Sequence, residues 1–407
     1  LGGHLTEWHG PANAKSVLAR LLRYAEVCGP VARVTLGPVR LVLVSDANVA
    51  AEVLDDPRAN YKGASYILTR AVLDNVLLLN GSAWEEHRSQ YKQALRDVDV
   101  LRSANLLSQR FVAETTPGPM VLDAAIIRLV GDVAAHFTAG ITLDPALEPH
   151  RRRVQYELAG LGIDLQCQPW AYFSPMRWVR LRQAVEALRA FFRAAVEARL
   201  RRPDPEAADI LNGFIALSKS GAYPDDVEAI QEGVVNFFFT AHDVLASSTA
   251  WCLDLLARHP DVQAELREAL RSLPAGALDR RDLDACEPLG RVVRESLRLF
   301  PGYALFGRTT RADMDIGGYS VPKGTVLIVS PFVTHRLDRH FPDAASFDPD
   351  RWKGRSLAPI GPAARDQYLP FGSGARGCLA VDRPELKISY WGTAYAEDGL
   401  EVTALRA

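Results

Sequence analysis

The stretch Asp225–Arg258 runs for 34 residues without a proline and carries apolar residues at the helical spacings of three and four. As one α-helix it would be about 50 Å long, because each residue adds about 1.5 Å along the axis. Its centre, Asn236–Val244, is apolar on nearly every side, which predicts burial. A buried helix of this length limits the chain to a large, mostly helical fold. Within that centre, His242 and Asp243 need partners, either backbone groups of an ordinary core or groups of a functional site.

The rest of the chain shows more helical periodicity, flanked by two β-rich segments. Further helices are predicted at Ala83–Arg96, Leu101–Thr115, Ala124–Ala139, Pro149–Leu161, Met176–Arg201 and Pro260–Ser272. β-Branched runs and turn residues predict strands at Val31–Leu36, Leu41–Val44, Asp315–Ile316, Tyr319–Val321 and Thr325–Val329. We therefore expect one domain over residues 1–407, mostly α, with an α-rich body and a smaller β-rich region.

Composition excludes several classes of protein. With 47 Lys and Arg against 49 Asp and Glu, the chain has no excess of positive charge for binding nucleic acid. No apolar run reaches the roughly 18–20 residues needed to cross a bilayer, so no membrane anchor is expected. The five cysteines are few, scattered and odd in number, which favours reduced thiols in a cytoplasmic protein over a disulfide framework.

The segment Phe371–Ala380 is the strongest sign of chemistry. It reads Phe-Gly-Ser-Gly-Ala-Arg-Gly-Cys-Leu-Ala, and its glycines allow a tight loop with N–H groups turned towards the sulfur of Cys378. The charge of Arg376 favours the thiolate, which is the form that binds metals. The alternative is an inert, buried cysteine, as we expect for the other four. The G-x-G-x-x-G pattern in this segment does not predict a nucleotide site, because too few residues follow it.

A second feature is the pair Glu295 and Arg298. Residues three apart share one face of a helix, so these two can form an ion pair and recruit a further arginine. Taken alone, such a pair is most often an ordinary surface contact.

Together these features resemble the cytochrome P-450 superfamily of haem-thiolate enzymes. Phe371–Ala380 resembles the family's haem-binding signature F-x-x-G-x-R-x-C-x-G, except that Ala380 replaces the last glycine. The resemblance implies that Cys378 is the axial ligand of the iron in haem b (iron protoporphyrin IX). It also assigns Phe371 and Arg376 to the cofactor site, and it implies the cytochrome P-450 fold.

Other segments match the family in the same order along the chain. Glu295 and Arg298 resemble its E-x-x-R pair, and Arg351 in the segment Phe347–Trp352 would complete a buried structural triad. The segment Trp84–Arg88 resembles the W-x-x-x-R of a helix that contacts the haem propionates. The resemblance therefore adds these residues to the cofactor site: Trp84, His87, Arg88 and Arg308.

The long helix departs from the family pattern in the segment that the family uses to activate oxygen. The family motif A-G-x-[D/E]-T aligns with Thr-Ala-His-Asp-Val at residues 240–244, so Asp243 provides the acid but Val244 replaces the threonine. A valine side chain cannot donate a hydrogen bond. The hydroxyl of Thr240 could compensate, or that of Ser247 if the helix is distorted. The candidate catalytic residues are Thr240, His242, Asp243 and Val244.

A substrate pocket is predicted beside this helix centre and the segment that follows Arg298. Family analogy adds Ile67–Val76 and Trp170–Phe173 to it. Most of its residues are apolar, which predicts a small apolar or aromatic substrate, although the aromatic residues could equally belong to the core. The candidates are Phe238, Ala241, Tyr303, Ala304, Leu305 and Phe306.

These observations predict a monooxygenase of secondary metabolism that uses O2. Because the chain shows no flavin or iron–sulfur segment, electrons are expected from a ferredoxin and a ferredoxin reductase, acting on a monomeric enzyme. A basic patch could dock the acidic ferredoxin. Its residues are Arg88, Lys92, Arg96, Arg383 and Lys387. The alternatives are a peroxygenase or a non-redox haem isomerase on the same fold, and a non-enzymatic haem sensor.

Overall fold

The computed structural model describes residues 14–36, 39–63, 76–115, 118–154, 175–274, 276–355, 367–379 and 401–404. Their contacts define two compact units. The first unit comprises residues 1–63, 115–126 and 244–407, and the second comprises residues 64–114 and 127–243. Helices α7 (Leu122–Ala139) and α11 (Val227–Arg258) contribute residues to both units. A single domain over the whole chain remains a prediction.

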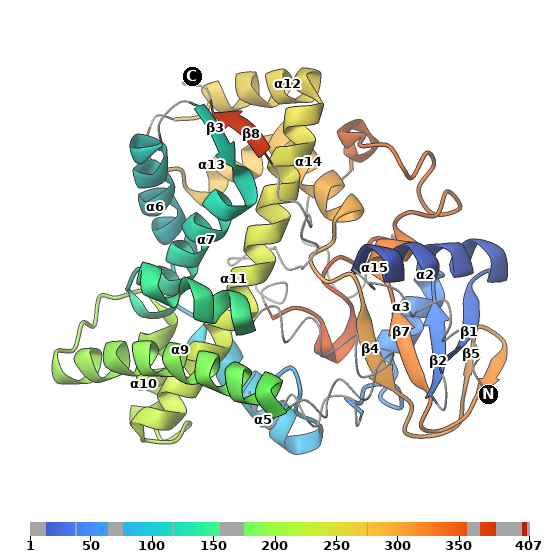
Figure 1. Ribbon diagram of the computed structural model, residues 1–407, viewed down its shortest axis with the longest axis horizontal. Helices are drawn as coiled ribbons and strands as arrows, with labels where there is room; N and C mark the ends of the chain where they lie inside the picture. Colours follow the sequence, from blue (N-terminus) through green and yellow to red (C-terminus); the bar gives the residue numbers. More distant parts are fainter. Residues whose placement is uncertain are drawn as a thin grey trace. The chain divides into compact units, whose positions relative to one another are not determined.

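The first unit contains a four-stranded sheet in the order β1-β2-β7-β4. Its strands are β1 (Val31–Leu36), β2 (Val39–Val44), β7 (Val326–Val329) and β4 (Phe306–Thr309). The predicted strand pair near the start of the chain is present as antiparallel β1 and β2. Strand β2 also runs parallel to β7, with Leu41 opposite Val326, so blue and orange strands lie side by side in Figure 1.

The three strands predicted in the second β-rich segment do not all pair with one another. Only β5 (Met314–Ile316) and β6 (Tyr319–Val321) pair with each other, in antiparallel register. Strand β7 leaves this hairpin and lies between β2 and β4. The local turn residues could not reveal this, because a parallel partner is reached only through a long crossover connection.

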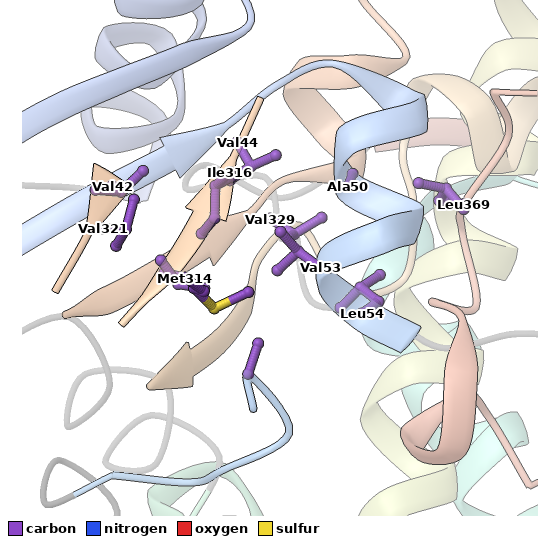
Figure 2. Close-up of a cluster of buried hydrophobic side chains, with 12 residues drawn as sticks. Val42, Val44, Ala50, Val53, Leu54, Met314, Ile316, Val321, Val329 and Leu369 are labelled. Atoms are coloured by element: carbon purple, nitrogen blue, oxygen red, sulfur yellow. The ribbon is translucent and has the colours of Figure 1, made fainter. Parts of the chain in front are cut away.

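A cluster of buried aliphatic side chains joins these strands to helix α3 (Ala47–Asp55). The helix begins at Asp46, whose carboxylate accepts the backbone N–H groups of Asn48 and Val49. Val53 and Leu54 of α3 point into the cluster, and Leu369 joins it from a distant part of the chain (Figure 2). Burying each such side chain stabilises the fold by about 1.5–3 kcal/mol. The cluster therefore holds the segment that leads into the cysteine loop.

The first unit has further helices and a small second pair of strands. Strands β3 (Gly118–Val121) and β8 (Glu401–Ala404) pair antiparallel. The helices are α2 (Ala14–Cys28), α12 (Pro260–Arg271), α13 (Arg280–Ala285), α14 (Glu287–Leu299), α15 (Pro331–Thr334), and the 3-10 helices η4 (Pro349–Trp352) and η5 (Gly374–Arg376).

The second unit consists mainly of helices in its described residues. These are α5 (Gly81–Ala94), α6 (Val100–Glu114), η2 (Pro145–Leu147), a helix over residues 148–154, α9 (Pro175–Arg201) and α10 (Ile210–Lys219). Helices α5 and α10 approach closely at Gly213, where a Cβ atom would lie 2.2 Å from the carbonyl oxygen of Ala94. Tyr91 of α5 stacks on Phe237 of α11 with ring centroids 4.8 Å apart.

Helix α11 begins slightly later than the sequence indicated. It starts at Val227 rather than at Asp225, because the carboxylate of Asp226 accepts the N–H of Ala229 at 2.7 Å and so caps the first turn. From there it continues without interruption to Arg258. The observed elements confirm the mostly α fold with a smaller β-rich region.

Candidate active site

The cysteine loop, residues Phe371–Leu379, is a tight turn built around η5. Gly372 and Gly374 have φ angles of +68° and +69°, a conformation that favours glycine. The N–H of Cys378 donates to the carbonyl oxygen of Phe371 at 3.0 Å and closes the loop. The side chain of Cys378 is half-buried. The glycine pattern therefore produces a narrow turn that ends in a thiol.

Helix α3 anchors this loop. The hydroxyl of Ser373, a residue only 4% exposed, donates to Oδ1 of Asp55 at 2.9 Å. A Cβ atom on Gly374 would lie 2.4 Å from the carbonyl oxygen of Leu54, so only glycine permits this approach. Sequence reasoning missed these contacts, because 318 positions separate Asp55 from Ser373.

Three cations of the first unit lie close together, namely Lys62, Arg308 and Arg376. Arg308 is buried on β4, and Arg376 donates through Nε to Oδ1 of Asn60. Burial, and then the charges of Arg308 and Arg376, hold the pKa of Lys62 well below its usual range. This concentration of positive charge suits an anionic group such as a carboxylate. Lys62 was missed in the sequence, since it belongs to none of the motifs considered.

The predicted triad is assembled within the first unit. Glu295 and Arg298 of α14 are fully buried, and the guanidinium of Arg298 donates to both carboxylate oxygens, at 2.7 and 2.9 Å. Arg351 donates through Nε to Oε1 of Glu295 at 2.9 Å. A further donor, Nε1 of Trp352, lies 2.9 Å from Oε2 and was not predicted. The alternative of a surface ion pair is therefore wrong.

His335 connects this triad to the cysteine loop. Its carbonyl oxygen accepts from Nη1 of Arg298 at 2.8 Å, and its Nε2 accepts the N–H of Leu369 at 2.8 Å. Burial, and then the charge of Arg298, lowers the pKa of His335 to about 3. The ring is therefore neutral near pH 7, as an accepting nitrogen requires.

In the second unit, helix α5 carries the residues predicted from the W-x-x-x-R pattern. Trp84 is buried, and Cζ of Arg88 lies 5.7 Å from the centre of its ring. Nδ1 of His87 lies 2.8 Å from the carbonyl oxygen of Ala83, one turn earlier, so His87 is held by its own helix. A role of these residues in a cofactor site remains a prediction.

The centre of α11 places the predicted catalytic residues in different surroundings. The hydroxyl of Thr240 donates to a backbone carbonyl one turn earlier, and Val244 is 2% exposed. Nδ1 of the buried His242 lies 2.9 Å from Oδ1 of Asp243. Arg151, which the sequence analysis did not identify, donates to the same Oδ1 at 3.3 Å.

The residues predicted to line a substrate pocket lie in varied environments. Phe238 is fully buried, packs on Phe192 with centroids 5.0 Å apart and stacks on His242, so it belongs to an aromatic core. Ala241 is also buried, whereas Tyr303 is exposed. The remaining three, Ala304, Leu305 and Phe306, are half-buried. Other predicted residues lie outside the described part of the chain: residues 67–75, Trp170–Phe173, Ala380, Arg383 and Lys387.

Comparison with known proteins identifies the class to which this fold and site belong. The profile of the family described as cytochrome P450 matches residues 145–379, more than half of the chain. The chain belongs to the cytochrome P450 family. The predicted family, its oxidoreductase class and its cofactor haem b are thereby confirmed.

Individual relatives and structures agree with this assignment. Pentalenene oxygenase of Streptomyces avermitilis is 32% identical over 181 residues, which cover 44% of this chain and 39% of that protein. Cyclooctat-9-en-7-ol 5-monooxygenase of Streptomyces melanosporofaciens is 29% identical over 375 residues, covering 86% of this chain and 78% of that protein. The structure of retinoic-acid-bound cyanobacterial CYP120A1 matches the fold with a TM-score of 0.76 at 21% identity, covering 94% of this chain and 86% of the other.

The first unit offers groups that fit haem b. Cys378 can supply a thiolate to the iron, and the cluster of Lys62, Arg308 and Arg376 has the charge that two propionate groups need. None of the helices in the described ranges is both long and apolar enough to cross a membrane.

Proposed function

We propose that the chain is a haem-thiolate monooxygenase that oxidises a small, largely apolar or aromatic molecule in secondary metabolism. The observation that carries the proposal is the cysteine loop, which presents one thiol on a turn tied to α3, in the same unit as three clustered cations. Haem bound through a thiolate supplies the activation of dioxygen and the transfer of one oxygen atom to a C–H bond.

The protein's part is to hold the cofactor and to control its surroundings. Cys378 would bind the iron, while Lys62, Arg308 and Arg376 would bind the carboxylates in the first unit. Trp84 and Arg88 are further candidates for the cofactor site by resemblance to the family. Asp243 would hold and move protons, since its carboxyl group is 17% exposed within the largely buried centre of α11.

A terpene-like hydrocarbon is the substrate class that we propose to test first. The names of two relatives refer to pentalenene and to cyclooctat-9-en-7-ol, which are cyclic and largely apolar. The candidate residues Ala304, Leu305 and Phe306 are apolar and half-buried, which agrees with such a ligand.

Electrons would come from a ferredoxin and its reductase. On α5, Arg88 and Lys92 are four residues apart and share one side of the helix, and Arg96 follows in the turn just beyond its end. An acidic electron donor is the complementary partner, since opposite charges speed association.

The test is turnover of purified, haem-loaded protein with ferredoxin, ferredoxin reductase, NADPH and 18O2. Cyclic terpenes and polar control compounds of similar size would be compared by the spin-state change of the haem and by 18O in the product. One 18O atom in a product of the apolar set supports the proposal. Turnover with peroxide alone would instead identify a peroxygenase, turnover without reductant an isomerase, and binding of haem without any product a sensor.

A further inference from the structure

The inference concerns Asn60, in the segment that follows α3 and contacts the cysteine loop. We call residues 55–62 the anchor segment. The hydroxyl of Ser373 donates to Oδ1 of Asp55 at 2.9 Å. Three residues later in the loop, Nε of Arg376 donates to Oδ1 of Asn60. Because Ser373 caps the start of η5 and Arg376 is its last residue, the anchor segment holds both ends of this short helix.

The backbone of the anchor segment is itself fixed within the first unit. The N–H of Thr309, at the end of β4, donates to the carbonyl oxygen of Tyr61 at 2.9 Å. The N–H of Arg311 donates to the carbonyl oxygen of Arg58 at 2.8 Å. These two bonds lie on either side of Asn60, so its side chain is held at a defined position.

The contact between Asn60 and Arg376 orients a charged group through an uncharged one. An arginine has five N–H groups, and Asn60 accepts the one on Nε. The oxygen of an asparagine side chain accepts hydrogen bonds but carries no net charge. The contact therefore fixes the plane of the guanidinium without neutralising it. A carboxylate at position 60 would fix the plane equally well, but it would also form an ion pair and offset the positive charge.

The anchor segment holds a second arginine in the opposite way. Oδ2 of Asp56 accepts from Nη2 of Arg58 at 2.6 Å, and Oδ1 accepts the N–H of the same residue at 2.7 Å. The side-chain hydrogen bond from Arg58 holds the pKa of Asp56 below its usual range, so Asp56 is ionised near pH 7. Within four residues, a carboxylate neutralises an exposed arginine and an amide orients an arginine of the cysteine loop.

The charge of Arg376 belongs to the cluster with Lys62 and Arg308. Burial lowers the pKa of Lys62, and the two charges that lower it further, those of Arg308 and Arg376, are both positive. Gathering like charges at partly buried positions costs free energy, and an anion that joins them offsets this cost. The propionate groups of haem b are such anions, and a planar guanidinium suits a carboxylate.

We propose that Asn60 is a positioning residue for haem b: it orients Arg376 as a neutral acceptor, so that the guanidinium binds a propionate group. The proposal rests on the cofactor and on neither the substrate nor the reaction. It requires two properties of one side chain, an oxygen that accepts from Nε and the lack of a charge.

Two substitutions separate these properties. Asn60→Asp keeps the acceptor and adds a negative charge, whereas Asn60→Leu removes the acceptor and adds no charge. We expect the ferric holoenzyme of each variant to release haem b to excess apomyoglobin about tenfold faster than the wild type, because each change weakens a charge-assisted hydrogen bond. Ser373→Ala is the matched control, since it removes the other side-chain contact between the anchor segment and the loop.

The dimethyl ester of haem b isolates the role of the propionate groups. In protein reconstituted with this ester, Arg376 meets no carboxylate of the cofactor, so both Asn60 variants should release the ester at the wild-type rate. Ser373→Ala should change the release of haem b and of its ester by the same factor. The CO absorption of thiolate-bound haem should persist in both Asn60 variants, because the ligand Cys378 is unchanged.

Three results would overturn the proposal. An unchanged release of haem b in either Asn60 variant would show that the orientation or the lack of charge has no effect. Equal acceleration for haem b and its ester would show a purely structural role. Loss of the CO absorption in Asn60→Asp would place the effect at the thiolate rather than at Arg376.

Discussion

The triad of Glu295, Arg298 and Arg351 and the centre of α11 both contain charged groups at buried positions. They differ in how far water reaches the carboxylate. Glu295 is inaccessible, and Arg298, Arg351 and Trp352 direct donors at its two oxygens. Asp243 is 17% exposed, its Oδ1 lies 2.9 Å from Nδ1 of His242, and the same oxygen accepts from Arg151 at 3.3 Å. The first network is closed to water, whereas the carboxylate of the second is partly accessible.

This difference explains where the chain can depart from the family pattern. A closed network holds a loop in one geometry, and removing any member leaves a buried charge without compensation. A network with a partly accessible carboxylate can accept another arrangement, because water can replace a missing donor. The chain keeps the triad residues and changes Thr to Val on α11, in agreement with this division.

The largest effect on the haem spectrum is expected from substitution of Cys378, the proposed ligand of the iron. Cys378→Ala should abolish the red-shifted CO absorption of thiolate-bound haem, because no other described cysteine lies in a turn of this kind. Cys252→Ala is the matched control, since burial raises the pKa of the Cys252 thiol to about 11 and keeps it protonated. A CO band retained in Cys378→Ala would reassign the ligand.

The next effect tests the closed network. Glu295→Ala should lower the free energy of unfolding by about 3–5 kcal/mol, because it leaves Arg298 and Arg351 without their shared carboxylate. Little folded, haem-loaded protein should result, as measured by haem content and thermal melting. Glu114→Ala, which removes an exposed i,i+4 ion pair with Arg110, should change stability by about 0.5 kcal/mol or less. Equal effects of the two changes would contradict the comparison.

His335, which links the triad to the cysteine loop, predicts that the stability of the fold depends on pH. The pKa of His335 is about 3 in the folded protein, against about 6.5 when unfolded, so the unfolded chain binds more protons between these values. Stability should therefore fall as the pH drops from about 6.5 towards 3, by up to about 1.4 kcal/mol per pH unit from this group.

The variant His335→Gln checks that assignment. Its amide oxygen can still accept from the N–H of Leu369, but the side chain does not titrate. Denaturant melts followed by haem absorption between pH 4.5 and 7 should show a flatter profile than the wild type. His150→Gln changes a histidine of the helix over residues 148–154, in the other unit, and serves as the control. An unchanged slope in His335→Gln would assign the acid sensitivity to other groups.

The smallest effect is expected on α11. Val244→Thr should raise product per electron about threefold for substrates without a hydroxyl group, which corresponds to about 0.6 kcal/mol between productive and unproductive rates. Asp243→Asn should slow the reaction with every substrate, because it removes the acid itself. Product per NADPH is the measurement. No change in Val244→Thr, together with wild-type turnover only with peroxide, would replace the monooxygenase by a peroxygenase.

The features that the sequence revealed are those whose residues are close together along the chain. Gly372 and Gly374 indicated the turn before Cys378, because a backbone with positive φ angles favours glycine wherever it occurs in a fold. The spacing of Glu295 and Arg298 predicted their ion pair, because about one helical turn separates them. The helix α11 was visible in the spacing of its apolar residues over nearly its whole length.

Only the tertiary structure decided which segments distant in the sequence are in contact, and how deeply those contacts are buried. The position of Lys62 beside Arg308, and of Arg151 beside Asp243, could not be read from local patterns, because Coulomb interactions depend on distance in space. The same holds for β7, whose parallel pairing with β2 joins segments separated by most of the chain. The sequence alone thus determined the glycine-rich turn before Cys378 and the long helix α11, and folding determined which charged groups face one another.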